Sequence, residues 1–302
     1  MPRWRTNLNA LQPVRKELGL RLDQQREQLD QTLAEQRQEL GLRLDEERTR
    51  TLNERFATAA DRLGADKPAA VRLAAVYAMA GLADDWPENC QTCIDVLCAY
   101  LRMPYEADSG KDAPAGKRLQ FRADQLVRHT VIRVITSHLR VGAGTSWQDR
   151  NFDFTGVVFD GGDFSNAEFS GGTVDFSNAE FSGGTVEFSN ARFAGGTVDF
   201  GGELLFSSRL GRLVPASFSG GTVNFSHAQF SGGTVNFSGA SFSGGTVDFY
   251  AEFSSGTVDL SEPRDWSTPP TFCSWDIHHT GCCCRAAGYR HSPRRALADF
   301  AS

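Results

Sequence analysis

Hydrophobic residues in the first fifth of the chain follow a helical period. From Arg15 to Leu63 the sequence is highly charged, free of Pro, and repeats the segment ELGLRLD at Glu17 and at Glu39. Leucines stand four and seven residues apart in alternation, which makes an 11-residue period of about 3.67 residues per turn. This narrow stripe predicts a long helix over residues 1–64 that pairs with a partner helix as a coiled coil. The leucines are Leu18, Leu22, Leu29, Leu33, Leu40 and Leu44.

The competing interpretation of this segment is a single solvated helix. Gly19 and Gly41 lower helix propensity, and the heavy charge keeps a lone helix in water.

Residues 65–143 predict a small helical module of three amphipathic helices. The first follows Asp66 and Pro68, and the second is expected to start at Asp84 or Asp85 with Pro87 in its first turn. The third begins near residue 117, after a polar loop at residues 106–116. The expected buried positions are Val71, Ala75, Ala78, Met79, Leu82, Cys90, Cys93, Ile94, Leu97, Cys98, Leu101, Val127, Val131, Val134 and Ile135.

Bulky apolar residues recur at short intervals over residues 144–262. Phe154, Phe159, Phe164 and Phe169 are five residues apart, and a small or apolar residue stands two positions before most of them. In an extended segment Ala167 and Phe169 share one face while Glu168 lies on the other. A polar pair then lets the chain turn. The pattern predicts short strands wound into a coil with an inward ladder of rings.

The period lengthens after Phe176, where a 12-residue unit recurs. Phe169, Phe181 and Phe193 then form one expected row, and Val174, Val186 and Val198 form another. Because five does not divide twelve, a regular winding of five-residue units cannot continue unmodified. The length of one coil therefore stays open at 12, 24 or some other number of residues. Residues 201–215 break the pattern, either as a surface loop or through a shifted reading frame, and residues 263–302 read as a disordered tail.

The repeats over residues 152–260 resemble the pentapeptide-repeat family. The resemblance implies a right-handed, four-faced β-helix with a central Leu or Phe and an earlier small residue pointing inward. A helical segment before such repeats also resembles a recurrent bacterial arrangement in which a membrane helix often comes first, and that membrane helix is missing here. The expected fold is therefore an α+β protein in several parts: long helix, α-helical module and C-terminal right-handed β-solenoid.

Charge separates the repeats from the rest of the chain. The formal net charge is −6, whereas residues 151–262 hold 13 acidic and three basic residues, or −10. A surface poor in Lys and Arg argues against direct nucleic-acid binding. An acidic row is interpreted as the solvated side of the solenoid; the alternative, which the family resemblance supplies, is an acidic surface that imitates DNA and inhibits gyrase. The row is Asp175, Glu187, Asp199, Asp248 and Asp259, with Asn224 and Asn236 in the same register.

Candidate chemical groups are few. Cys90, Cys93 and Cys98 fall on the apolar stripe of a helix, so packing is favoured over a thiol or metal site. His129 and His138 are interpreted as surface or satisfied core residues. The tail could bind zinc, but disorder or a shifted frame is favoured there. Its potential ligands are His278, His279, Cys282, Cys283 and Cys284.

We therefore expect a protein that is not an enzyme and has no catalytic, cofactor-binding or metal-binding residues and no cofactor. Phosphate-loop, zinc-protease and nucleophile-elbow motifs are missing from the sequence. The expected role is a protein–protein interaction scaffold with self-association through the N-terminal helix. An enzyme or thiol site in the helical module is the remaining alternative. With no signal sequence and no apolar run of about 18 residues, the expected location is cytoplasmic.

Overall fold

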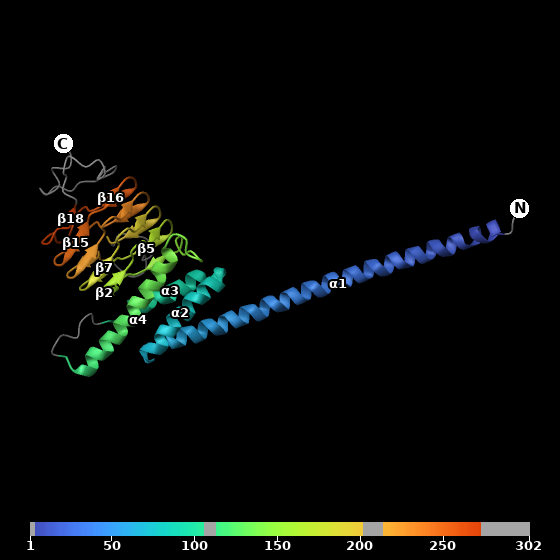
Figure 1. Ribbon diagram of the computed structural model, residues 1–302, viewed down its shortest axis with the longest axis horizontal. Helices are drawn as coiled ribbons and strands as arrows, with labels where there is room; N and C mark the ends of the chain where they lie inside the picture. The colour runs from blue at the N-terminus through green and yellow to red at the C-terminus, as the bar shows by residue number, and fades with distance from the viewer. Residues whose placement is uncertain (1–3, 106–112, 202–213, 273–302) are drawn as a thin grey trace. The chain divides into compact units, whose positions relative to one another are not determined.

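The computed structural model describes residues 4–105, 113–201 and 214–272 (Figure 1). The chain divides into two compact units, residues 1–55 and residues 56–302, and each is described by itself. The order of elements is helices first and short strands afterwards, which confirms the predicted fold class of helical parts followed by a parallel β-solenoid.

The first unit consists of most of helix α1 (Trp4–Arg62), which contains Pro13 near its start and ends within the second unit. After Pro13 the sequence is dominated by Leu, Arg, Gln and Glu, all good helix formers. Glu17 pairs with Arg21 at 2.8 Å and Glu39 with Arg43 at 2.6 Å, each with the acid four residues earlier in the helix. The six leucines of the predicted stripe are 39–60% exposed. The helix therefore presents its apolar stripe to solvent.

The helical module contains α2 (Ala69–Asp85), the 3₁₀ turn η1 (Pro87–Asn89), α3 (Cys90–Arg102) and α4 (Ala115–Leu139). Helix α2 packs against α3 and α4. Arg72 of α2 is buried and binds Asp124 of α4 at 2.6 Å and the Tyr100 hydroxyl of α3 at 2.9 Å. This charge-assisted pair of contacts joins all three helices.

The predicted start of the second helix is wrong. Asp84 and Asp85 belong to the last turn of α2 rather than to the cap of α3. Pro87 opens the separate 3₁₀ turn, and α3 begins at Cys90 without a side-chain cap. The Asp84 carboxylate instead accepts a hydrogen bond from Trp147 Nε1 at 3.1 Å. The local pattern predicted that Asp84 caps a helix, whereas its carboxylate binds Trp147, 63 residues later in the sequence.

The second half of the described chain forms four parallel sheets that wind into a solenoid (Figure 1). The chain visits the sheets β1-β5-β9-β13-β17, β2-β6-β10-β14, β3-β7-β11-β15-β18 and β4-β8-β12-β16 in that order. The strands are β1 (Phe152–Asp153), β2 (Val158–Phe159), β3 (Gly162–Asp163), β4 (Glu168–Phe169), β5 (Thr173–Asp175), β6 (Glu180–Phe181), β7 (Thr185–Glu187), β8 (Arg192–Phe193), β9 (Thr197–Asp199), β10 (Ser217–Phe218), β11 (Thr222–Asn224), β12 (Gln229–Phe230), β13 (Thr234–Asn236), β14 (Ser241–Phe242), β15 (Thr246–Phe249), β16 (Glu252–Phe253), β17 (Thr257–Asp259) and β18 (Thr271–Phe272).

One coil of the solenoid is two of the 12-residue repeats long. Thr173 pairs with Thr197, and Thr222 pairs with Thr246. The last coil is one residue shorter, since Thr234 pairs with Thr257 and Asp248 pairs with Thr271. Each repeat therefore supplies two of the four sides, so two repeats close a coil.

The first coil is shorter than the others. Phe159 pairs with Phe181, and in the same coil the Thr173 N–H donates to Asn151 Oδ1, which lies 22 residues earlier. The five-residue spacing of the first Phe residues accounts for this shorter coil.

The expected row of Phe169, Phe181 and Phe193 is wrong, because it mixes two sides of the coil. Phe169 stacks on Phe193 with ring centroids 5.2 Å apart. Phe181 stacks on Phe218 at 4.7 Å in a different sheet. A single repeat carries the chain through half a coil, so only residues a whole coil apart share a column.

Four columns of stacked Phe rings fill the interior. Neighbouring rings in a column lie 4.4–5.3 Å apart, close to the spacing of paired strands. Buried Val and Ala side chains lie between the columns and complete the core. Nearly all of these Phe, Val and Ala side chains are fully buried. The columns are Phe154–Phe176–Phe200–Phe237, Phe159–Phe181–Phe218–Phe242, Phe164–Phe188–Phe225–Phe249–Phe272 and Phe169–Phe193–Phe230–Phe253.

Two adjacent glycines precede every Thr-Val strand of the described coils except β17, where Ser255 takes the first position. Gly233 has φ of +69°, and a Cβ there would lie 2.5 Å from the carbonyl oxygen of Gly196 in the coil before. A Cβ on Gly232 would lie 2.3 Å from the carbonyl oxygen of Ala194. The first glycine permits close stacking, and the second also supplies a left-handed backbone. The recurring Gly-Gly-Thr-Val sequence is thus explained by turn geometry.

The solenoid continues in register on both sides of residues 202–213, which lie outside the described residues, as does most of the predicted surface loop. Thr185 pairs with Thr222, and in the same pair of strands Asn224 donates to Glu187, 37 residues earlier. The extra length of this step falls between β9 and β10. Strand pairing therefore keeps the same register before and after the interruption.

The predicted solenoid boundary at residue 262 is too early. Strand β18 pairs with β15 and extends the ladder to Phe272. Residues 263–272 thus contain ordered strand pairing rather than only the expected disordered tail.

The helical module covers the first coil. Arg128 of α4 donates to the Val158 carbonyl at 2.8 Å, and Thr136 donates to the Asp163 carbonyl at 2.8 Å. Ile132 lies so close to Gly162 that a Cβ on this glycine would be 2.9 Å from Ile132 Cδ1. Repeat arrays need a cap because their end coils would otherwise expose core residues to water. Here α3 and α4 keep the first-coil Phe rings buried.

Phe225 offers a direct test of the ring columns, since it is fully buried and stacks on Phe188 at 4.9 Å and on Phe249 at 4.7 Å. We expect Phe225→Ala to lower the free energy of unfolding by about 3–5 kcal/mol, because it leaves a cavity in a close-packed column. Phe225→Leu should lose roughly half as much. Chemical denaturation measures both changes. The exposed Tyr250→Ala serves as control, and a loss there equal to that of Phe225→Ala contradicts the column model.

Candidate functional site

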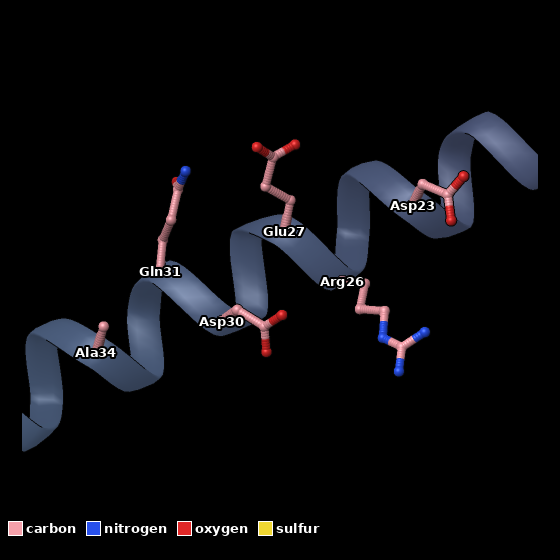
Figure 2. A pocket seen from close by; sticks show the side chains of 6 residues that line it. All are labelled: Asp23, Arg26, Glu27, Asp30, Gln31 and Ala34. Atoms are coloured by element: carbon pink, nitrogen blue, oxygen red, sulfur yellow. The ribbon is translucent and has the colours of Figure 1, made fainter.

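A shallow depression on α1 does not form an enclosed site. Its lining residues all belong to one helix, and Figure 2 shows Glu27 and Gln31 pointing to one side while Arg26 points to the other. Side chains that diverge from a single helix cannot converge on one reacting atom. The lining residues are Asp23, Arg26, Glu27, Asp30, Gln31 and Ala34. The expectation of no catalytic and no cofactor-binding residue stays a prediction.

The three helical cysteines lie in the core of the module. Cys90, Cys93 and Cys98 are free and buried. Burial, with a smaller contribution from Cys90, raises the pKa of the Cys93 thiol to about 11, and burial raises the pKa of Cys98 further. A thiol with a raised pKa is a poor nucleophile and a poor metal ligand. The packing interpretation of these residues is therefore supported.

Within the described residues, no group of three His, Cys, Asp or Glu side chains could hold a metal ion. The potential zinc ligands His278, His279, Cys282, Cys283 and Cys284 lie outside the described residues. Among the helices in the described ranges, none is long and apolar enough to cross a membrane.

Both histidines of the module have partners that the sequence did not reveal. His138 stacks on Trp147 with centroids 3.9 Å apart, and its Nε2 lies 3.2 Å from Asp84. His129 Nε2 lies 3.2 Å from Asp160. These carboxylates are 54 and 31 residues away in the sequence, so no local pattern could have found them. Both histidines are satisfied residues at packing contacts, as interpreted.

Asp160 is the centre of a polar contact between the helical module and the first coil. It is buried and accepts hydrogen bonds from Tyr105 at 2.6 Å and Gln125 at 2.8 Å, besides its contact with His129. Burial alone would raise its pKa, but the hydrogen bonds from His129, Tyr105 and Gln125 outweigh burial and hold the pKa of Asp160 below its ordinary value. Both carboxylate oxygens of Asp160 have hydrogen-bond partners within the protein, so we interpret the cluster as a structural contact rather than a reactive site.

The acidic row divides into two rows on opposite sides of the solenoid. One row runs Asp175, Asp199, Asn236 and Asp259, and the other runs Asp163, Glu187, Asn224 and Asp248. In the first row Asp175, Asp199 and Asn236 are buried, which corrects the interpretation of a solvated side. Gly201 lies against the Asn236 side chain, since a Cβ on this glycine would be 2.5 Å from Asn236 Nδ2.

These side chains stabilise the corners of the coil. Asp175 Oδ1 accepts the backbone N–H of Ser177 at 2.8 Å, and Asn236 Oδ1 accepts that of Ser238 at 2.8 Å. This is an Asx turn, which mimics a backbone turn with a side chain. Asn236 also donates to Asp199 Oδ1 at 2.9 Å across neighbouring coils. The sequence signal was present as Asp or Asn two residues before Ser.

The sides of the solenoid present short polar side chains in regular rows. Thr185, Thr222 and Thr246 pair in one sheet and form an outward row, beside the half-buried Glu187 and Asn224. The opposite sheet carries a similar Thr row, whereas the two narrower sheets carry one mixed outward row each. The mixed rows are Val158, Glu180, Ser217 and Ser241, and Glu168, Arg192, Gln229 and Glu252.

The described part of the second unit thus defines a class of protein: a parallel β-solenoid with a ring-filled interior and a helical cap on its first coil. The family model described as pentapeptide repeats (9 copies) matches residues 154–203, so this stretch is a pentapeptide-repeat segment, and the resemblance is confirmed. Strands β10 to β18 continue the same ladder beyond the matched residues. Neither a curated protein nor a solved structure matches the chain.

Asn236 tests whether the buried row depends on an amide between Asp199 and Asp259. Asn236→Asp would remove the hydrogen bond that the Asn236 amide donates to Asp199 and would place a further buried carboxylate against Asp199, so we expect a loss of about 2–3 kcal/mol in the free energy of unfolding. Asn224→Asp makes the same change opposite Glu187 on the half-buried row, and should cost less than about 1 kcal/mol. Denaturant titration compares the two variants. Equal losses would show that burial of the row carries no energetic weight.

Asp160 generates a pH-dependent prediction. Because its folded pKa is lowered, it stabilises the fold above the unfolded pKa of about 4, and this stability is lost as the pH falls through the folded value. Asp160→Asn should therefore cost about 1–2 kcal/mol at pH 7 and progressively less below pH of about 4. Unfolding curves at several pH values measure the difference. The exposed Asp163→Asn is the control, and a difference for Asp160→Asn that grows on acidification rejects this assignment.

Proposed function

We propose that the protein is a non-enzymatic interaction scaffold in which the sides of the solenoid bind a protein partner. The observation that supports this most is the filled interior: in the described coils, four columns of stacked Phe rings with buried Val and Ala side chains occupy the inside of the solenoid. Pentapeptide-repeat proteins are generally non-enzymatic, and the family match suggests a role in protein interaction. What remains accessible is a set of flat polar rows, which suits recognition of another macromolecule.

The proposed role includes self-association through α1, whose leucine stripe is exposed. A cytoplasmic location remains a prediction.

The alternative of a DNA-mimicking gyrase inhibitor receives no support from these contacts. Such mimicry requires carboxylates spaced along an exposed surface, where they can stand in for phosphates. Asp175 and Asp199 are buried and hydrogen-bonded to turns instead. The other row contains Asn224 between Glu187 and Asp248, which dilutes its charge.

Single arginines on each side of the solenoid test the proposal in the full chain. The substitutions Thr234→Arg, Ser217→Arg, Thr222→Arg and Gln229→Arg each enlarge an outward side chain in a different sheet. We expect one of them to weaken capture of the partner by about tenfold or more, as at an interface hot spot, and the other three to retain it. Capture on immobilised protein with quantitative mass spectrometry measures this.

Each variant should keep the parent's thermal unfolding midpoint, which is the control for folding. Undiminished capture of the same partner by all four variants, or no specific partner at all, contradicts the proposal.

A further inference from the structure

We propose that α1 binds a second copy of this chain as a parallel, in-register, two-stranded coiled coil over Leu18 to Leu44. This inference rests on the self-association included in the proposed function and adds its orientation and stoichiometry. The surface concerned is the row of six exposed leucines on α1. It is separate from the sides of the solenoid.

The leucines alone do not choose an orientation. Their spacings of four and seven residues in alternation read the same in both directions, with residue 31 at the centre. An antiparallel partner could therefore place its Leu44 opposite Leu18, just as a parallel partner places Leu18 opposite Leu18. The residues beside the stripe must decide.

The two borders of the stripe differ in charge. Arg26 comes four residues after Leu22 and three before Leu29, so it lies beside the stripe on one side. Gln25 comes three residues after Leu22 and four before Leu29, so it lies on the other side. The 11-residue repeat continues both borders with little drift. One border carries Arg15, Arg26, Arg37 and Arg48, and the other carries Gln25, Gln36 and Glu47.

An antiparallel pair brings each border against its own copy. With residue 31 at the centre, Arg26 would meet Arg37 of the second chain, and Arg15 would meet Arg48. Four arginine–arginine contacts would then line one side of the interface, each of them repulsive. No acidic residue on that border lies adjacent to the stripe to offset them.

A parallel pair brings the arginine border against the other border. Arg26 then faces Gln25 of the second chain, Arg37 faces Gln36, and Arg48 faces Glu47. An arginine can donate to a glutamine carbonyl or pair with a glutamate, as flanking residues do in parallel coiled coils. Arg21 and Arg43 lie further from the stripe and already bind Glu17 and Glu39 of their own helix.

The width and length of the stripe limit the assembly to two chains. Two leucines in each 11-residue period cover one seam, whereas a helix between two partners needs a wider apolar face. The stripe ends after Leu44, because Thr51 and Arg55 occupy the next two positions of the pattern.

Light scattering on the full chain tests self-association first. The expected mass is that of two chains, and Leu29→Asp with Leu33→Asp should reduce it to one. Leu20 and Leu42 provide a matched control, since they are equally exposed but lie two residues from Leu18 and Leu40, on the other side of the helix. Leu20→Asp with Leu42→Asp should leave the mass unchanged. A one-chain mass for the parent protein contradicts both self-association and the coiled coil, and a mass above two chains contradicts the stoichiometry.

Arg48→Glu then tests the orientation. In the parallel pair the introduced carboxylate would face Glu47 of the second chain twice per dimer, so the dissociation constant should rise by roughly threefold to tenfold. In an antiparallel pair the same carboxylate would face Arg15, and the constant should fall. Under mild oxidation Leu18→Cys should form a covalent dimer by itself, above the background of the parent chain. A two-chain mass combined with tighter binding by Arg48→Glu, or with no Leu18→Cys dimer, overturns the parallel orientation alone.

Discussion

Face-to-face stacking of Phe rings at the spacing of paired strands is the interaction on which the solenoid depends. Each coil is too short to bury its own side chains, and its strands are mostly two or three residues long. A ring such as Phe200 becomes buried only because Phe176 lies on one side and Phe237 on the other, at 4.6 and 4.4 Å. Stability therefore arises between coils rather than within them, and an end coil requires a cover.

The rest of the second unit follows from this requirement. Glycine pairs such as Gly232 and Gly233 let successive coils approach to the distance at which rings stack. Asp or Asn at the corners satisfies the turn N–H groups that no ladder reaches. The helical module supplies Arg128, Ile132 and Thr136 to close the first coil. The polar groups around Asp160 resemble a catalytic cluster, but they form hydrogen bonds between the helical module and the first coil.

Much of the fold could be predicted from the sequence, because its features are periodic. Inward Phe and Ala positions follow from alternation in a strand, and the three module helices follow from apolar spacing, with Pro68 marking the start of the first. Coil length could not be predicted, since a 12-residue repeat is compatible with a whole coil or half of one. The burial of Asp175 and Asp199 was also hidden, because an Asp that follows a strand valine has the same local pattern whether it is buried or exposed. Long-range partners such as Asp84 for His138 leave no local signal at all.

The half-coil repeat has a consequence for how such an array changes in length. Gaining or losing a pair of 12-residue units would leave every later side chain on its original side of the shaft. Gaining or losing a single unit would turn everything downstream by half a revolution and exchange opposite sides. Duplication in odd and even numbers would therefore have different outcomes for any ligand-recognition surface, although both would preserve the aromatic interior.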